Sequence, residues 1–288
     1  MPWSMKYPII GGEPRLVEEL QKANPGYFAV VTNGAKQALL ASFYAYKKLT
    51  SFKSVFHAAP YWVSYPNLAR HAGLEFVFKS DGINCITLPN NPDGYQILPS
   101  VSYHIWDAVY ASPIYGWNGN KPNAEVIIGS AAKAFGLAGY RVGWALTKNP
   151  KLYNQIRLYV EETTSGVSTP SQSQIARMVC LANWQDDDYC KFVEEAAQTI
   201  KNNGKIFNQT ITPICDHVLG VPKTETGMFA WFRPIDDERF KKARTEAKVL
   251  LVDGKYCGGE EGYYRMNMAH DNETTEKTLK SLSEEYVK

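Results

Sequence analysis

The sequence predicts an α/β protein with a mostly parallel central sheet, helices on both of its faces, and a smaller α+β part at the C-terminal end. Three observations support this prediction. Short apolar runs alternate with helical stretches up to about residue 150. Polar or glycine-containing turns follow several of these runs. Strands and helices then mix without that rhythm towards the C-terminus. A strand–helix–strand rhythm is typical of a parallel sheet covered on both faces.

The first half of the chain contains the strands of the predicted sheet, each a short apolar run bounded by turn residues. Between them, residues 35–49 are rich in good helix formers, and residues 67–73 predict a short helix that ends at Gly73. The predicted strands are residues 27–32, 54–58, 75–78, 85–88, 102–108, 125–130 and 141–147.

The second half begins with helical patterns and then returns to strands. Helices are predicted at residues 151–162, 171–184 and 187–207, and strands at residues 227–234, 247–254 and 263–270. The change from helical patterns back to strands falls within or just after the third predicted helix, residues 187–207. We therefore predict a large domain of residues 7–195 and a small C-terminal domain of residues 196–288.

Composition and charge exclude several classes of function. The chain has 288 residues and a net charge of +2, which gives no electrostatic reason to expect nucleic acid or an anionic membrane as a partner. The five cysteines form no CxxC pair and the five histidines have no metal-ligand spacing, so we expect no disulfide framework and no metal site. The N-terminus lacks a long apolar region and no run reaches membrane-spanning length, so we expect a cytoplasmic protein.

Lys133 stands in an unusual place for a charged residue. It lies between two alanines, directly after the apolar run 125–130 and among several glycines. A lysine in such surroundings is easily desolvated, and desolvation favours its neutral, nucleophilic amine. Such an amine suits a Schiff base with a carbonyl cofactor. Taken alone, the stretch is equally well explained as a small-residue turn that carries one exposed lysine.

Polar residues at the ends of other predicted strands complement this lysine. Ligands of an open parallel sheet bind at the carboxyl ends of its strands. The Asn33-Gly34 turn feeds a helix N-terminus, where free amides and the helix dipole favour a phosphate. Asp107 ends a buried strand and needs a partner, and Tyr110 follows it closely. A phosphate anchor, a carboxylate, a phenol and an enclosed lysine together suit pyridoxal phosphate.

Six motifs carry a resemblance to a known family: VTNGAKQAL, APYWVSYP, LPNNPDG, DAVY, SAAKAFGLAGYRVGW and YYRMNMA. In this order they resemble the fold-type I, pyridoxal-phosphate-dependent class I/II aminotransferase superfamily, over roughly residues 7–270. A closer similarity, to the branch of the plant tryptophan aminotransferases and alliinases, is carried by NNPDG, KAFGLAGYRVGWAL, TTSGVSTPSQSQ and CGGEEGYYRMNMAHDNE. TNGAKQAL and APYWVSYP are instead nearer to aspartate-type aminotransferases.

The resemblance implies roles around the cofactor ring. Lys133 would form the Schiff base with pyridoxal 5'-phosphate and then move the substrate proton. Asp107 would pair with the protonated ring nitrogen and keep the ring an electron sink. Asn91 and Tyr110 would hydrogen-bond the phenolic oxygen of the ring.

The resemblance also implies how the rest of the cofactor is held. Trp62 would stack on the face of the ring, with Tyr61 as the alternative. The phosphate would be bound by Ser130, Arg141 and the backbone amides of Gly34, Ala35 and Lys36.

Two further residues concern the substrate and the assembly. Arg265 would bind the substrate α-carboxylate with its planar pair of donors, next to Asn91 and Trp62. Tyr7 resembles the tyrosine that reaches the phosphate of the neighbouring subunit. The resemblance therefore implies a homodimer with a shared active site.

The implied function is transfer of an amino group from an L-amino acid to a 2-oxo acid by a ping-pong mechanism. Aromatic residues around Tyr61, Trp62 and Tyr65 favour an aromatic or apolar substrate side chain. A β-eliminating C–S lyase of the alliinase type would use the same Lys133, Asp107 and Arg265 and is the first alternative. A non-catalytic binding protein of this fold is a more remote one.

Overall fold

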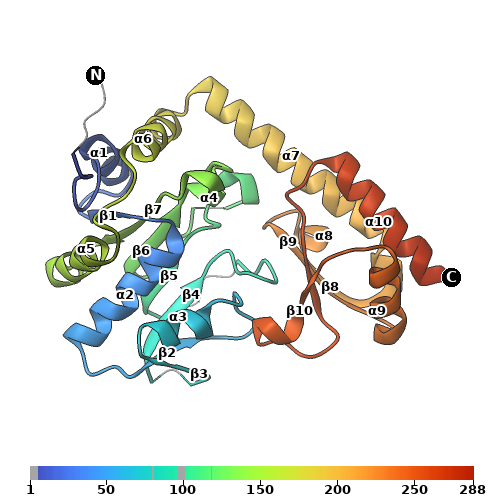
Figure 1. Cartoon of the computed structure of the whole chain (residues 1–288). Coiled ribbons are helices and arrows are strands. Elements are labelled where there is room, and N and C mark those ends of the chain that lie inside the picture. Colours follow the sequence, from blue (N-terminus) through green and yellow to red (C-terminus); the bar gives the residue numbers. More distant parts are fainter. Residues whose placement is uncertain (1–5, 80, 97–100, 118) are drawn as a thin grey trace.

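The computed structural model describes residues 6–79, 81–96, 101–117 and 119–288 and contains two sheets (Figure 1). Within these residues the larger sheet has seven strands in the order β1-β7-β6-β5-β4-β2-β3. Only β7 runs antiparallel to its neighbours, so the predicted mostly parallel sheet is confirmed. The strands are β1 (Phe28–Thr32), β2 (Ser54–His57), β3 (Glu75–Val77), β4 (Ile83–Thr87), β5 (Tyr103–Asp107), β6 (Ala124–Ser130) and β7 (Gly143–Thr147).

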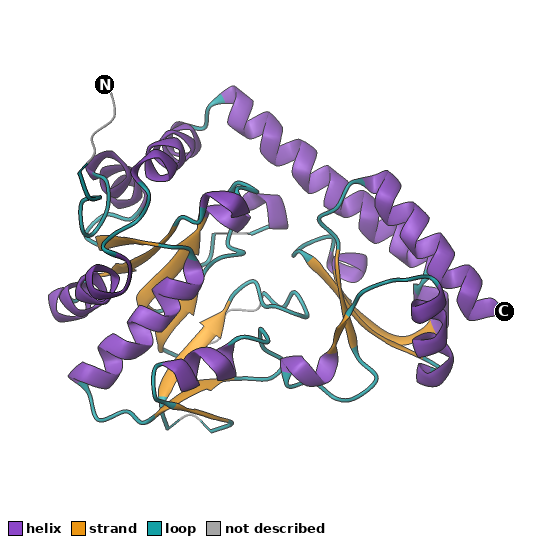
Figure 2. Cartoon of the chain, in the orientation of Figure 1, coloured by secondary structure: helices purple, strands orange, loops and turns teal. Residues whose placement is uncertain are grey.

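Successive side chains of a strand point to opposite faces, so a continuous apolar run places apolar side chains on both faces of this sheet. Val30 of β1 is buried on one face, and its neighbours Ala29 and Val31 are buried on the other. Helices cover each face (Figure 2). The first face is covered by α2 (Ala35–Leu49), α3 (Tyr65–His71) and α5 (Pro150–Thr164), and the second by α1 (Pro14–Ala23) and α6 (Thr169–Trp184).

The small domain has an antiparallel sheet packed against helices, which confirms the predicted α+β texture. Its strand order is β10-β11-β9-β8. Phe207, Phe232 and Phe240 are fully buried at its centre. The elements are β8 (Cys215–Gly220), α8 (Val221–Thr224), β9 (Phe229–Pro234), α9 (Asp237–Glu246), β10 (Val252–Asp253), β11 (Tyr264–Asn267) and α10 (Asn272–Val287).

One long helix, α7 (Asp187–Thr210), joins the two domains (Figure 1). Asp186 caps its first turn by accepting a hydrogen bond from the amide of Asp188. Tyr189 near its start is buried in the large-domain core, whereas Phe207 near its end is buried in the small-domain core. The domain boundary that we predicted near residue 196 lies inside this unbroken helix and stays a prediction.

Some predicted elements were wrong. Residues 247–254 were predicted as a strand, but only Val252 and Asp253 pair with a neighbour, and Leu250 is 98% exposed. The strand predicted from residue 141 begins at Gly143, because Arg141 has a left-handed backbone with φ of 54°. Strand β8 and helix α1 were not predicted.

The described residues contain no cluster of three His, Cys, Asp or Glu side chains able to hold a metal ion. None of the described helices combines the length and the apolar character that crossing a bilayer requires.

Candidate active site

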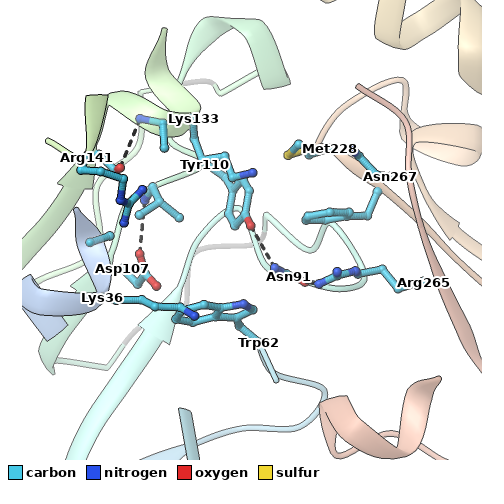
Figure 3. A pocket seen from close by; sticks show the side chains of 15 residues that line it. Lys36, Trp62, Asn91, Asp107, Tyr110, Lys133, Arg141, Met228, Arg265 and Asn267 are labelled. Atoms are coloured by element: carbon cyan, nitrogen blue, oxygen red, sulfur yellow. Dashed lines mark hydrogen bonds between the residues drawn. The ribbon is translucent and has the colours of Figure 1, made fainter. Parts of the chain in front are cut away.

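A cavity of about 340 Å³ lies where the carboxyl ends of β4, β5 and β6 face the small domain (Figure 3). This is the edge at which parallel sheets bind ligands. The large domain contributes Ala35, Lys36, Trp62, Asn91, Asp107, Val109, Tyr110, Ser130, Ala132, Lys133 and Arg141. The small domain contributes Met228, Phe229, Arg265 and Asn267.

One corner of the cavity suits a phosphate. Gly34 precedes α2 with φ of 80°, and no side chain caps the helix. A Cβ at Gly34 would lie 2.5 Å from Nη2 of Arg141, so a larger residue would displace this guanidinium, and the positive φ also favours glycine. The predicted role of the Gly34 amide needs correction, since it donates to the Thr32 carbonyl at 2.8 Å. The amides of Ala35 and Lys36 lie in the first turn, where a helix offers no carbonyl to bond them.

Trp62, rather than the alternative Tyr61, lines the cavity. Tyr61 is buried away from it and packs its ring edge against Phe76. Tyr65 is fully buried as well, so Trp62 is the only one of the three predicted aromatic residues to face the cavity. Lys36 lines the cavity too, and its Nζ lies 5.4 Å from the centroid of the Trp62 ring. Its side chain, and not only its amide, is therefore part of the site.

Asp107 ends β5 with almost no exposure to solvent. Its carboxylate accepts hydrogen bonds from the Tyr65 hydroxyl at 3.1 Å and, over 3.4 Å, from the Val109 amide. Burial nevertheless raises the pKa of Asp107 to about 7, because these bonds offset only part of the cost of a desolvated charge. A positively charged ligand group in the cavity would remove that conflict.

Lys133 lies in the one-turn helix α4 (Ala131–Ala134), which the predicted turn had not anticipated. Ser130 caps this helix, since its hydroxyl accepts from the Ala132 amide at 3.2 Å. The Tyr115 hydroxyl donates to the Lys133 carbonyl at 3.1 Å. Burial, and then the charge of Arg265, lower the pKa of the Lys133 amine. Its neutral, nucleophilic form is thereby favoured.

A hydrogen-bonded row joins the two domains across the cavity (Figure 3). Nδ2 of Asn91 donates to the Tyr110 hydroxyl at 2.9 Å, and Nη1 of Arg265 donates to Oδ1 of Asn91 at 2.8 Å. The guanidinium of Arg265 also lies 4.6 Å from the Phe229 ring centroid. Its Nε is buried and has no partner within the described structure. An unpaired donor beside a cavity suits a carboxylate ligand.

Two of the predicted site residues do not line this cavity: Gly34, which lies next to the cavity residues Ala35 and Arg141, and Tyr7. Tyr7 lies apart from the cavity. Its side chain is 84% exposed, and it borders a separate surface hollow together with Tyr140 and Pro170. Its predicted role was towards a neighbouring subunit, and that role stays a prediction.

The sequence did not identify five residues that line the cavity: Val109, Ala132, Met228, Phe229 and Asn267. One of them had a usable signal. Asn267 lies two residues after Arg265 on β11, and residues two apart on a strand share a face.

The allinase family model matches residues 21–286 of the chain. Tryptophan aminotransferase-related protein 2 of Arabidopsis thaliana is 28% identical over 89% of this chain and 67% of its own length. The protein of the same description from Oryza sativa subsp. japonica is 29% identical over 90% and 60%. An alliin lyase of Allium cepa var. aggregatum is 32% identical over 31% of this chain and 21% of its own length. The chain thus spans about two thirds of the first of these relatives and less of the others.

Solved aspartate aminotransferases have the same fold. The Thermus thermophilus enzyme with maleate superposes with a TM-score of 0.80 at 22% identity, over 97% of this chain and 84% of that chain. The Thermotoga maritima enzyme gives a TM-score of 0.74 at 21% identity, over 97% and 83%.

The cavity residues fit the cofactor of this fold. A phosphate fits the corner where Gly34 lies beside the Arg141 guanidinium, and a protonated ring nitrogen supplies the positive partner that buried Asp107 lacks. Lys133 supplies a partly desolvated amine for the aldehyde. The chain belongs to the allinase family, within the fold-type I aminotransferase superfamily, and its cofactor is pyridoxal 5'-phosphate.

Proposed function

We propose that the protein is an aminotransferase that moves an amino group from an L-amino acid to a 2-oxo acid by a ping-pong mechanism. The observation that carries this proposal is that Lys133, Asp107 and Arg265 face one cavity, with an amine, a carboxylate and a guanidinium held in its walls. The names of the tryptophan aminotransferase-related relatives support it.

Each residue has a distinct task in this reaction. Bound pyridoxal phosphate supplies an aldehyde that condenses with amines and a ring that withdraws electrons from the substrate. Asp107 would pair with the protonated ring nitrogen, and Asn91 and Tyr110 would hydrogen-bond the phenolic oxygen of the ring. Lys133 would take the proton from the substrate Cα as general base and then, as general acid, give it to the carbon of the cofactor's former aldehyde group.

Arg265 binds the substrate carboxylate and thereby orients Cα. Its free Nε donor and its place across the cavity from Lys133 suit this task (Figure 3). A substrate carboxylate that is held in an ion pair with Arg265 stays on Cα, whereas the bond from Cα to hydrogen breaks and Lys133 takes the proton. This arrangement favours proton transfer over decarboxylation.

A β-eliminating C–S lyase is the second candidate, because alliin lyases align with part of the chain and the family model carries the allinase description. Such an enzyme would use the same Lys133 to remove the Cα proton. Its substrate would carry a sulfur leaving group on Cβ, and its products would be the released sulfur compound, pyruvate and ammonia.

An amino-donor panel tests the proposal. The purified protein loaded with pyridoxal phosphate is mixed with single amino acids, with and without a 2-oxo acid, and absorbance and products are recorded. Amino transfer predicts loss of the aldehyde form of the cofactor without a 2-oxo acid and its recovery when one is added. Release of pyruvate and ammonia from a cysteine conjugate alone would establish the lyase instead. Lys133→Ala should abolish either reaction.

We also propose a homodimer in which Tyr7 of one subunit reaches the cofactor phosphate of its partner. The high exposure of Tyr7 and its distance from its own cavity support this proposal. Sedimentation equilibrium tests it, and a monomer with full activity would contradict it. A cytoplasmic location is likewise our proposal from the sequence.

A further inference from the structure

We propose that Tyr65 is a positioning residue for Asp107. It belongs to a buried hydrogen-bonded chain, Asp107–Tyr65–Thr87–His57, that holds one carboxylate oxygen and leaves the other for the ring nitrogen of pyridoxal phosphate. The inference rests on the proposed function only as far as cofactor binding is concerned.

The chain crosses four elements of the large domain, from β5 through α3 and β4 to β2. The Tyr65 hydroxyl lies 3.1 Å from Oδ2 of Asp107 and 3.0 Å from Oγ1 of Thr87. Nε2 of His57 lies 3.1 Å from the same Oγ1 and 3.0 Å from the Thr87 amide. All four side chains are at most 4% exposed. Solvent therefore cannot replace any of these bonds.

The direction of the protons in this chain follows from its ends. Nδ1 of His57 lies 2.8 Å from the Ala58 carbonyl, which only accepts, so Nδ1 carries the proton. Burial lowers the pKa of His57 to about 4, so the ring is neutral and Nε2 is an acceptor. The single lone pair of Nε2 accepts from the Thr87 amide, so no proton lies between Nε2 and the Thr87 hydroxyl, and His57 holds Thr87 through its backbone. The Thr87 hydroxyl can therefore donate to the Tyr65 oxygen, and the Tyr65 proton goes to Asp107.

This order of donors stabilises the charged form of Asp107. The Tyr65 hydrogen bond lowers the pKa of the carboxyl, opposing the rise that burial causes. Among the described residues the other oxygen, Oδ1, receives only the long bond from the Val109 amide, and Asp107 lines the cavity. Oδ2 is thus held by the buried Tyr65 hydroxyl, whereas Oδ1 can pair with a positive charge in the cavity.

Tyr65→Phe removes the hydroxyl and keeps the ring that fills the core. We measure the Kd of pyridoxal phosphate for the apoprotein, and the Kd of its 1-deaza analogue, in which carbon replaces the ring nitrogen. Because a hydrogen bond to a charged group is lost, we expect the Kd of pyridoxal phosphate to rise about tenfold. The Kd of the deaza analogue, which has no charge to pair with Asp107, should change less than twofold.

Tyr46→Phe is the matched control. Tyr46 is also a buried tyrosine of the large domain whose hydroxyl donates to a carboxylate, Glu125 Oε2 at 2.8 Å, but it lies outside the cavity. Both Kd values should stay unchanged in this variant. Thr87→Val provides a second test that keeps the shape of the core, and we expect a smaller rise for pyridoxal phosphate alone. It decides the matter if Tyr65→Phe does not fold.

Equal Kd values of pyridoxal phosphate for wild type and Tyr65→Phe would overturn the inference. An equal rise in the Kd of the deaza analogue would overturn it too, because it would show that the hydroxyl supports only the shape of the pocket. Failure of the proposed function looks different. In that case the wild-type protein binds pyridoxal phosphate with the expected dependence on Tyr65 but transfers no amino group.

Discussion

A buried carboxylate without a positive partner is costly, and Asp107 is in this position in the cofactor-free protein. Burial raises its pKa from 3.8 to about 7, so the folded state holds the proton more tightly than the unfolded state does. The associated stability is fully present below about pH 4. It is lost as the pH rises through 7 and the carboxyl ionises.

We therefore predict that Asp107→Asn stabilises the apoprotein at high pH. The free energy of unfolding of the variant, relative to wild type, should increase between pH 4 and pH 8 by at most about 4 kcal/mol, from the size of the pKa shift. Urea titrations at both pH values measure it. Glu162→Gln, at an exposed position on α5, is the control and should show no such increase. A difference that does not depend on pH would contradict the assignment.

Arg265 gives the second prediction at the scale of one residue. Arg265→Lys keeps the charge but loses the fork that bonds Asn91 and the substrate carboxylate together. We expect KM for the amino donor to rise at least tenfold, with little change in the Kd of pyridoxal phosphate. Arg233→Lys on the neighbouring strand β9 is the control, since Arg233 pairs with Asp216 at the surface. Equal KM values for the two variants would refute the role of Arg265.

At the scale of one element, the turn between β1 and α2 depends on Gly34. Gly34→Ala should lower stability by about 1 kcal/mol through its positive φ and should also displace Arg141. We expect the Kd of pyridoxal phosphate to rise at least tenfold. Gly26→Ala is a close control, because Gly26 has φ of 81° and open space around its Cβ position. If both variants bind the cofactor equally, the close approach to Arg141 has no role in binding.

The elements of the large sheet were predictable because they are buried on both faces and so read as continuous apolar runs. The prediction for helix 35–49 agrees with α2. Strand β8 escaped because its polar start and partly exposed residues give no such run. Residues 247–251 misled in the opposite way. Val249 and Leu251 are apolar because they pack onto the small-domain core, although no neighbouring strand pairs with them.

At the scale of the whole molecule, three of the five cavity residues that the sequence missed, Met228, Phe229 and Asn267, come from the small domain. Phe229 and Met228 reach the cavity only because β9 is set against the large domain, and no local pattern states how two domains meet. The large-domain residues could be collected from the sequence since strand ends of a parallel sheet share one edge. The other residues of the hydrogen-bonded chain that ends at Asp107, in contrast, lie on three other elements of the same core.

The contact between the domains gives the fourth prediction. The amide of Tyr61 donates to the Cys257 carbonyl at 2.8 Å, and a Cβ at Gly258 would overlap the Tyr61 ring. Gly258→Ala should push this loop, and with it the strand that carries Arg265, away from the large domain. We expect KM for the amino donor to rise several-fold, and the Kd of pyridoxal phosphate to change less than twofold. Gly26→Ala again controls for the positive φ, and a reversed pattern would contradict the docking role.

The unbroken course of α7 has a consequence for how this chain tolerates change. Its 24 residues extend about 36 Å, at 1.5 Å per residue. Each end of this helix is buried in the core of a different domain. Each residue also turns the helix by about 100°. One residue inserted in the middle of α7 would therefore rotate Phe207, and with it the whole small domain, about the helix axis. The number of residues in α7 thus sets the rotation of the small domain, and so the direction from which Arg265 faces Lys133.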